Sequence, residues 1–306
     1  MTSLQASARL GTWQVEDTQI VSLLFEPRRR IAGAPSILLV HGLESSRDSW
    51  LLVGERLADE TGARVIAVDL PGFGDSPSRR DASFHTFSSL IRAASDDLGP
   101  TVVAGHSMGG AIALHASRRS RSIAGTVLVA SVYPPPFGRM NPLFMRGVLP
   151  VVGPRVFARH HSNAVDEMRA RFQHGTYDSS QLDERIAERY YALAQQRADS
   201  ADARMTLARS CRSLFLHLCA PYGMFADMIG VRKPVLLLHG AQDRWVPALS
   251  ARAALTLRGG WDGAILEACG HIPTLEQPEE VADRMIEWYR SKFVSKHVRR
   301  PRQTRS

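Results

Sequence analysis

The sequence predicts an α/β protein built on a doubly wound, mostly parallel sheet of eight strands, with a helical insertion. Three observations lead to this prediction. Short apolar runs recur along the chain, and each is followed by a loop and an amphipathic helical pattern. The runs are continuously apolar, as in parallel strands that are covered on both faces. Between residues 132 and 230 no such run occurs, and helical patterns take its place.

The expected strands begin with an antiparallel pair. Residues 12–25 alternate between apolar and polar side chains, with a turn at Glu16-Asp17. Six short buried strands follow, at residues 37–40, 65–68, 101–104, 125–130, 234–239 and 264–268. In sheets of this type the carboxyl ends of parallel strands share one edge, where ligands bind. We therefore expect the following loops to meet there: those that start at His41, Asp69, Ser107, Ser131, Gly240 and Cys269.

Helical patterns lie between the strands and throughout the insertion. Outside the insertion they cover residues 49–58, 84–98, 111–118, 248–257 and 281–293. Within the insertion they cover residues 165–173, 182–196 and 202–218. We predict a core formed by residues 1–131 and 231–294, a helical cap or lid at residues 132–230, and a basic C-terminal tail at residues 295–306 that is disordered.

Composition excludes several classes of protein. The chain has 306 residues, of which 44% are hydrophobic and 22% are charged, as in soluble globular proteins with a large core. The net charge of +8 is largely a property of the tail, which holds five Lys and Arg and no acidic residue. No basic patch is interleaved with aromatic residues, so no nucleic-acid partner is expected. No apolar run is long enough for stable membrane insertion.

The three cysteines, Cys211, Cys219 and Cys269, show no metal-ligand spacing and favour a reducing compartment. The N-terminus lacks the basic start and apolar core of a secretory signal, so we expect a cytoplasmic protein. The pair His160-His161 has no acidic or cysteine partner at ligand spacing. We therefore expect no metal. Both a monomer and a homodimer stay open.

The most specific motif in the chain surrounds Ser107. The apolar run 101–104 leads into Gly105-His-Ser-Met-Gly109, and a helical pattern follows at once. This is the strand, sharp turn and helix context of a G-x-S-x-G motif. Glycines two residues before and two after the serine let the strand and the helix approach closely. Ser107 is therefore expected to project above the sheet edge as a nucleophile.

A serine nucleophile needs a base within hydrogen-bond reach, and the base needs an orienting partner. Two loops at the expected edge each offer one such group. Asp243 is the only acid in the loop after strand 234–239, and His271 is the only base in the loop after strand 264–268. The loop after strand 125–130 holds no acid. Asp243 is thus expected to orient His271.

With these motifs in order, the chain resembles the α/β-hydrolase superfamily in its capped serine-hydrolase form, of carboxylesterase or lipase type. The order Ser107, Asp243, His271 is the order of nucleophile, acid and base in that superfamily. The resemblance covers residues 12–293. It rests on five loops: His41-Gly42, Asp69–Ser76, Gly105–Gly110, His239–Asp243 with Val246-Pro247, and Gly270–Pro273 with Leu275–Pro278. The insertion shows no matching motif.

The resemblance implies an oxyanion hole formed by the backbone N–H groups of Leu43 and Met108. It also implies a small-molecule acyl substrate and no cofactor. Four residues are candidate substrate contacts, each with a structural alternative: His41 and His106, which are structural or line the pocket, and Leu214 and Phe215, which line an acyl pocket or pack inside the cap. Asp75 is expected to be a hydrogen-bonding residue of its loop.

The sequence indicates a serine hydrolase that cleaves a carboxylic ester or similar acyl bond through an acyl-enzyme intermediate. Three alternatives stay open: a carbon–carbon bond hydrolase, a cofactor-free perhydrolase or haloperoxidase on the same triad, and a non-catalytic small-molecule receptor. The first usually has a longer Gly-Pro-Gly type loop than Leu43-Glu-Ser45 provides, and the complete set of triad residues argues against the last. The fold does not assign the substrate.

Overall fold

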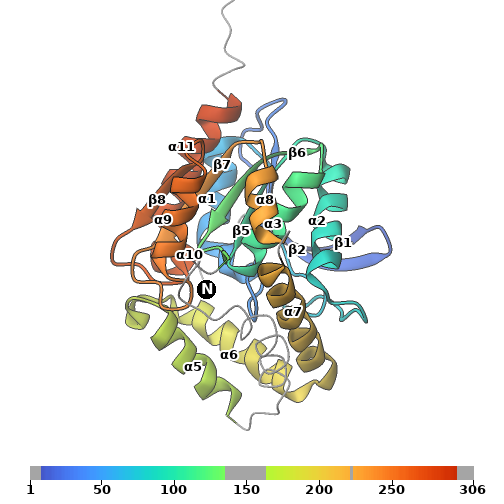
Figure 1. Ribbon diagram of the computed structural model, residues 1–306. Helices are drawn as coiled ribbons and strands as arrows, with labels where there is room; N and C mark the ends of the chain where they lie inside the picture. Colours follow the sequence, from blue (N-terminus) through green and yellow to red (C-terminus); the bar gives the residue numbers. More distant parts are fainter. Residues whose placement is uncertain (1–7, 135–162, 221–222, 295–306) are drawn as a thin grey trace, which may run out of the picture.

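The computed structural model describes residues 8–134, 163–220 and 223–294. Its centre is one eight-stranded sheet with the order β1-β2-β4-β3-β5-β6-β7-β8 (Figure 1). The strands are β1 (Ala8–Val15), β2 (Thr18–Phe25), β3 (Ser36–Val40), β4 (Val65–Val68), β5 (Thr101–His106), β6 (Ile123–Val129), β7 (Val235–Gly240) and β8 (Asp262–Leu266). Only the pairs β1–β2 and β2–β4 are antiparallel. The predicted eight-stranded, mostly parallel sheet is therefore confirmed.

Helices cover both faces of the sheet (Figure 1). One face is covered by α1 (Leu51–Thr61) and α11 (Pro278–Tyr289), which α10 (Pro273–Glu276) precedes and the π-helical turn η4 (Arg290–Val294) follows. The other is covered by α2 (Phe84–Leu98), α3 (Met108–Arg119), α8 (Met224–Gly230) and α9 (Ala248–Leu257).

The continuously apolar strands are explained by this double cover. In β3, Ile37 and Leu39 pack towards α1 and α11, whereas Leu38 and Val40 pack towards α2 and α3. All four side chains are at most 1% exposed. Successive residues of a strand point to opposite faces, so a strand buried on both sides carries apolar residues at every position.

Of the described helices between β6 and β7 in sequence, three gather at one end of the sheet, at the bottom of Figure 1. They are α5 (Ala164–Gly175), α6 (Glu184–Asp199) and α7 (Ala201–Cys219), with the short 3-10 turn η3 (Ser179–Gln181) between α5 and α6. Helices α5 and α6 share an apolar cluster of their own, which includes Phe172, Tyr190 and Leu275 of α10. Helix α7 instead packs on α2, where Ser213 Oγ accepts a hydrogen bond from the Phe84 N–H. The described helices of the insertion therefore contact the layers around the sheet at α10 and at α2.

The predicted helices within the described residues are confirmed to within four residues. Two strands begin and end earlier than expected. β6 ends at Val129 because the next residue, Ala130, adopts a φ of 42° that no strand residue takes. β8 ends at Leu266, two residues before Ala268, which has a φ of 51°. The tail at residues 295–306 and His160-His161 lie outside the described residues. Among the residues described, no helix combines the length and the apolar character needed to cross a membrane.

Candidate active site

Ser107, Asp243 and His271 meet at the carboxyl edge of the sheet, after β5, β7 and β8 respectively. The His271 Nδ1–H donates to Asp243 Oδ2 at 2.7 Å, and the Ser107 hydroxyl donates to His271 Nε2 at 3.0 Å. All three residues are at most 9% exposed. The side chains that the sequence predicts as nucleophile, acid and base thus form one chain of hydrogen bonds.

The turn that carries Ser107 is tight and strained. Ser107 has a φ of 51° and a ψ of −115°, a conformation that residues with a Cβ rarely adopt. A Cβ on Gly105 would lie 2.1 Å from the carbonyl oxygen of Gly109, and a Cβ on Gly109 would lie 2.4 Å from that of Val40. Both positions therefore exclude any side chain, as the motif predicts.

Asp243 is held by backbone groups on one side and by histidines on the other. Its Oδ1 accepts hydrogen bonds from the N–H groups of Trp245 at 2.9 Å and Val246 at 2.8 Å, while the His239 Nε2 lies 3.2 Å from Oδ2. Burial by itself raises the pKa of Asp243, but the hydrogen bonds with His239 and His271 outweigh it and hold the pKa below 3.8. The carboxylate is therefore ionised and fixes the proton of His271 on Nδ1.

Glu276 stabilises the loop around His271, residues 270–272, through hydrogen bonds to its backbone. Glu276 accepts hydrogen bonds from the N–H of Gly270 at 2.8 Å and from that of Ile272 at 2.9 Å, one on each side of His271. The N–H of His271 itself donates to the carbonyl oxygen of Gly175, in α5, at 2.7 Å. Sequence reasoning placed Glu276 in the histidine-loop motif without assigning it this role.

His106 supports the same loop from below. Its Nε2–H donates to the carbonyl oxygen of His271 at 2.7 Å, and burial lowers its pKa to about 3, so the ring is neutral. Trp245 covers the other side, with its ring stacked on that of His271 at 5.9 Å between centroids. No feature of the sequence pointed to this role of Trp245, which is 45% exposed.

The expectation that His41 contacts substrate needs correction. Its Nε2 accepts a hydrogen bond from the Leu70 N–H at 3.0 Å, and its Nδ1 donates to the Gly42 carbonyl at 2.7 Å. The residue is fully buried, and burial lowers its pKa to about 4. Because both nitrogens of the neutral ring are occupied, His41 joins the loops after β3 and β4. It is a structural residue.

The backbone of two loops lies directly beside Ser107. Met108 is the first residue of α3, so its N–H has no partner within the helix. On the other side, a Cβ on Gly42 would lie 3.1 Å from the Cβ of Ser107. Leu43 follows Gly42 and lines the same cavity as Ser107. These positions suit the two N–H donors that the resemblance implies.

A cavity of about 280 Å³ opens at Ser107. His106, Leu214 and Phe215 line it, as expected for substrate contacts. Further apolar lining comes from α5, α7 and neighbouring loops: Val132, Met168, Phe172, Cys211, Leu218, Val246 and Ile272. The cavity therefore lies between the sheet edge and the insertion, with largely apolar walls.

One end of the cavity is charged. Glu44 pairs with Arg171 of α5 and lies 3.6 Å from the guanidinium of Arg197 of α6. Burial lowers the pKa of each arginine to about 10, and their mutual repulsion adds to this for Arg171. Tyr190 closes the same end through a 2.6 Å hydrogen bond between its hydroxyl and that of Ser45. The insertion had no readable motif, so sequence reasoning missed this group.

Asp75 forms hydrogen bonds, as expected from the sequence, and it also connects its own loop to α6. Its Oδ2 accepts from Arg47 at 2.7 Å and from Arg189 of α6 at 2.5 Å. Arg189 also reaches Asp48 at 3.1 Å. These ion pairs hold α6 against the loops after β3 and β4.

Among the described residues, one group of side chains has the chemistry and spacing of metal ligands: His115, His217 and Asp227. None of the three lines the cavity at Ser107. Sequence reasoning did not single them out, because they come from three helices and share no motif.

Comparison with known proteins supports the fold and extends over most of the chain. A sequence model of the alpha/beta hydrolase family matches residues 37–284. The pimeloyl-[acyl-carrier protein] methyl ester esterase of Aromatoleum aromaticum is 26% identical over 261 residues, which cover 81% of this chain and 95% of that protein. An sn-1-specific diacylglycerol lipase of Mus musculus is 32% identical, over only 34% of each chain.

Solved structures show the same fold. A putative lipase from Acinetobacter baumannii has a TM-score of 0.72 and 21% identity, and the match covers 93% of both chains. The 2-hydroxy-6-oxo-6-phenylhexa-2,4-dienoate hydrolase from a Rhodococcus species has a TM-score of 0.72 and 20% identity, and the match covers 92% of this chain and 99% of that one.

Proposed function

The chain belongs to the alpha/beta hydrolase family, and from that membership we propose that it is a serine hydrolase that cleaves carboxylic esters. The observation that carries this proposal is the hydrogen-bonded series from Ser107 through His271 to Asp243. It supplies a nucleophile, a base and an orienting carboxylate, joined in the order that acyl transfer needs.

In the first half of the reaction, His271 Nε2 takes the proton of Ser107 as its Oγ attacks the ester carbonyl. The N–H groups of Leu43 and Met108 hold the developing oxyanion. In a known case the loss of one such donor costs about 2.7–4 kcal/mol. His271 then gives its proton to the leaving alcohol, and Asp243 stabilises the imidazolium in between.

In the second half, His271 activates a water that attacks the acyl-enzyme, and Ser107 is regenerated as the acid leaves. In the proposed cap, residues 132–230, the described helices α5 and α7 line the cavity at Ser107, and there they would limit access of water. We extend the proposal to a monomer or homodimer in the cytoplasm, which rests on the sequence alone.

The cavity supports an acyl group of modest size. Its volume of about 280 Å³ is close to the lower end of the roughly 300–1,000 Å³ typical of small-molecule sites. Leu214, Phe215 and Leu218 of α7 give it an apolar wall suited to an alkyl chain. Similarity to a protein named as a pimeloyl-[acyl-carrier protein] methyl ester esterase also supports the proposal that this chain cleaves esters.

A carbon–carbon bond hydrolase is the second candidate. It is favoured by the 27% identity, over 82% of both chains, to a 2-hydroxy-6-oxo-6-(2'-aminophenyl)hexa-2,4-dienoic acid hydrolase. The short loop Leu43-Glu-Ser45, which departs from the longer loop usual in that class, makes it the weaker candidate. Turnover of a vinylogous diketone with no turnover of esters would favour it.

The test compares wild type, Ser107→Ala and the control Ser89→Ala on p-nitrophenyl esters with acyl chains of increasing length. Ser89 lies on the exposed side of α2. We expect Ser107→Ala to lower kcat by roughly 10⁴-fold or more and Ser89→Ala to leave it unchanged. A fluorophosphonate probe should label Ser107 alone. Wild type as inactive as Ser107→Ala on every ester, or a label on another residue, would contradict the proposal.

A further inference from the structure

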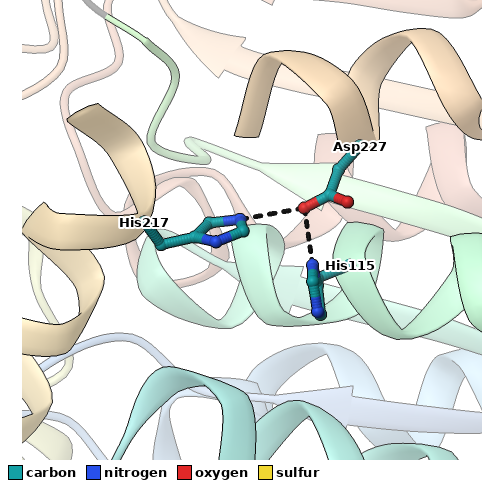
Figure 2. A group of neighbouring side chains, drawn as sticks. All are labelled: His115, His217 and Asp227. Atoms are coloured by element: carbon teal, nitrogen blue, oxygen red, sulfur yellow. Dashed lines mark hydrogen bonds and ion pairs between the residues drawn. The ribbon is translucent and has the colours of Figure 1, made fainter. Parts of the chain in front are cut away.

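Three buried side chains meet on the face of the sheet that α3 covers. His115 comes from α3, His217 from α7 and Asp227 from α8, and Figure 2 shows both rings directed at one carboxylate oxygen. The His115 Nδ1 lies 2.7 Å and the His217 Nε2 lies 2.9 Å from Asp227 Oδ2. All three residues are at most 5% exposed, and the esterase chemistry uses none of them.

We propose that His115, His217 and Asp227 form a binding site for a divalent transition-metal ion, with Zn²⁺ as the reference ion. Two imidazole nitrogens and one carboxylate oxygen are a donor set typical of zinc. One ligand atom from each residue lies within 4.8 Å of the other two. The set comes from three different helices, so an ion there would cross-link them.

The ring geometry fits one shared ion. With Zn–N bonds of about 2.0–2.1 Å, two imidazoles on one ion have ring centroids roughly 5 Å apart. The centroids of His115 and His217 are 4.9 Å apart. The same bond lengths place tetrahedral ligand atoms about 3.3 Å from one another, so each nitrogen must move about half an ångström away from Asp227 Oδ2. Side-chain rotation supplies a movement of this size.

Binding requires each of the two rings to present an unprotonated nitrogen to the ion. In the structure the Nδ1–H of His115 and the Nε2–H of His217 donate to the carboxylate. In the metal-bound form each neutral ring carries its proton on the other nitrogen. Asp227 Oδ2, which both rings already face, would supply the oxygen ligand.

Neighbouring groups orient the three ligands. Arg118 Nη1 donates to the second carboxylate oxygen, Asp227 Oδ1, at 3.2 Å. The ring of Phe84 stacks on His217 with 4.1 Å between centroids and 22° between planes. His85 is exposed, and its ring centroid lies 5.2 Å from that of His115 and 5.5 Å from that of His217. The side of the cluster next to His85 therefore faces solvent. The ion and a fourth ligand would reach the site from that side.

The ion would have a structural effect on the cavity wall. Helix α7 carries His217 and also Leu214 and Leu218, which line the cavity. A metal that joins α7 to α3 and α8 would hold this wall against the helix that begins immediately after Ser107. Ester cleavage by the triad does not itself require the ion.

The experiment titrates the chelator-treated full chain with Co²⁺, whose visible absorption reports ligand number and type, and then displaces it with Zn²⁺. We expect one ion per chain and a higher Tm with Zn²⁺ that EDTA reverses. His217→Gln and Asp227→Asn should each raise Kd at least tenfold. The control His174→Gln, at an exposed position on α5, should leave Kd unchanged.

A crystal of the wild-type chain grown with Zn²⁺ keeps the test decisive if a variant does not fold. The anomalous peak should lie about 2.0–2.2 Å from one ligand atom of each residue. No binding by wild type, an unchanged Kd in folded variants, or a peak elsewhere, such as at the triad, would overturn the proposal. The cluster would then be a hydrogen-bonded network only.

Discussion

The carbonyl oxygen of Gly175 accepts a hydrogen bond from the backbone N–H of His271 at 2.7 Å. The last residue of α5 is thereby tied directly to the loop that carries the candidate base. Tyr177, just beyond α5, donates its N–H to Glu276 at 2.7 Å, and Glu276 also holds the loop on both sides of His271. The end of α5 and the His271 loop therefore share one hydrogen-bonded unit, and movement of α5 is expected to displace the imidazole.

Glu276→Gln is expected to lower kcat more than it changes KM. A carboxylate accepts all three N–H groups, whereas the amide group of glutamine presents its own N–H to one side. The His271 loop then shifts, and a displacement of about 1 Å can cost on the order of 10²-fold in rate. Steady-state kinetics on the best ester gives both constants. Glu287→Gln on the exposed face of α11 is the matched control.

Two outcomes with Glu276→Gln would contradict this prediction. If folded Glu276→Gln retains the wild-type kcat, then Gly175 and His106 hold the loop without help from Glu276. If KM rises while kcat is unchanged, Glu276 acts on substrate binding and not on the position of His271.

Gly109→Ala is expected to destabilise the protein strongly and to abolish activity. The new Cβ would lie 2.4 Å from the carbonyl oxygen of Val40 and 2.5 Å from that of His41, and neither backbone atom can rotate away. Overpacking of this kind costs about 1–3 kcal/mol or more. Thermal unfolding and ester turnover measure both effects. Gly259→Ala is the control, because a Cβ there meets no atom within 4 Å. Equal Tm values for the two variants would contradict the prediction.

The core fold and the meeting of Ser107, Asp243 and His271 at one sheet edge could be predicted because each depends on local pattern. Buried parallel strands are readable as apolar runs, since both faces of each strand are covered. The triad is readable because every member stands alone in its loop: Asp243 is the only acid after β7, and His271 is the only base after β8. Parallel topology then brings those loops to one edge.

The remaining features could not be predicted because they depend on contacts between distant segments. The two nitrogens of His41 form hydrogen bonds with its neighbour Gly42 and with Leu70, which is 29 positions further along the chain. No periodic pattern in the sequence predicts these hydrogen bonds. The cluster of His115 and Asp227 joins residues 112 positions apart. Arg171 and Glu44 likewise meet only because α5 folds back over the loop after β3.

The stability of the protein should depend on pH through Asp227. Its pKa in the folded chain is held below the ordinary value of 3.8, so its charged form stabilises the fold at higher pH. This contribution is fully present above about pH 4 to 5 and is lost as the pH falls through the folded-state pKa. Asp227→Asn removes hydrogen bonds to a charged group and should cost about 1.5–3 kcal/mol at pH 7.

Urea unfolding at several pH values, with EDTA present, measures whether the contribution of Asp227 to the free energy of unfolding falls as the pH falls. The difference in unfolding free energy between wild type and Asp227→Asn should narrow as the pH drops below 4. Asp202→Asn, in the exposed first turn of α7, should give a much smaller difference at pH 7. If the difference in unfolding free energy between wild type and Asp227→Asn widens at low pH, the carboxyl group of Asp227 is protonated in the folded protein, and the prediction is wrong.

Leu214→Trp is expected to shift ester preference towards short acyl chains. Leu214 is 4% exposed on α7 and lines the cavity, so the larger indole fills part of a space of about 280 Å³. Loss of room for one or two methylenes changes kcat/KM by about 10–200-fold, and the loss should fall on the longer esters alone. Leu216→Trp is the matched control, since it lies on the same helix at 49% exposure. If folded Leu214→Trp keeps the wild-type ratio of kcat/KM between long and short esters, the acyl chain does not lie against α7, and the charged end near Arg171 becomes the side of the cavity that receives it.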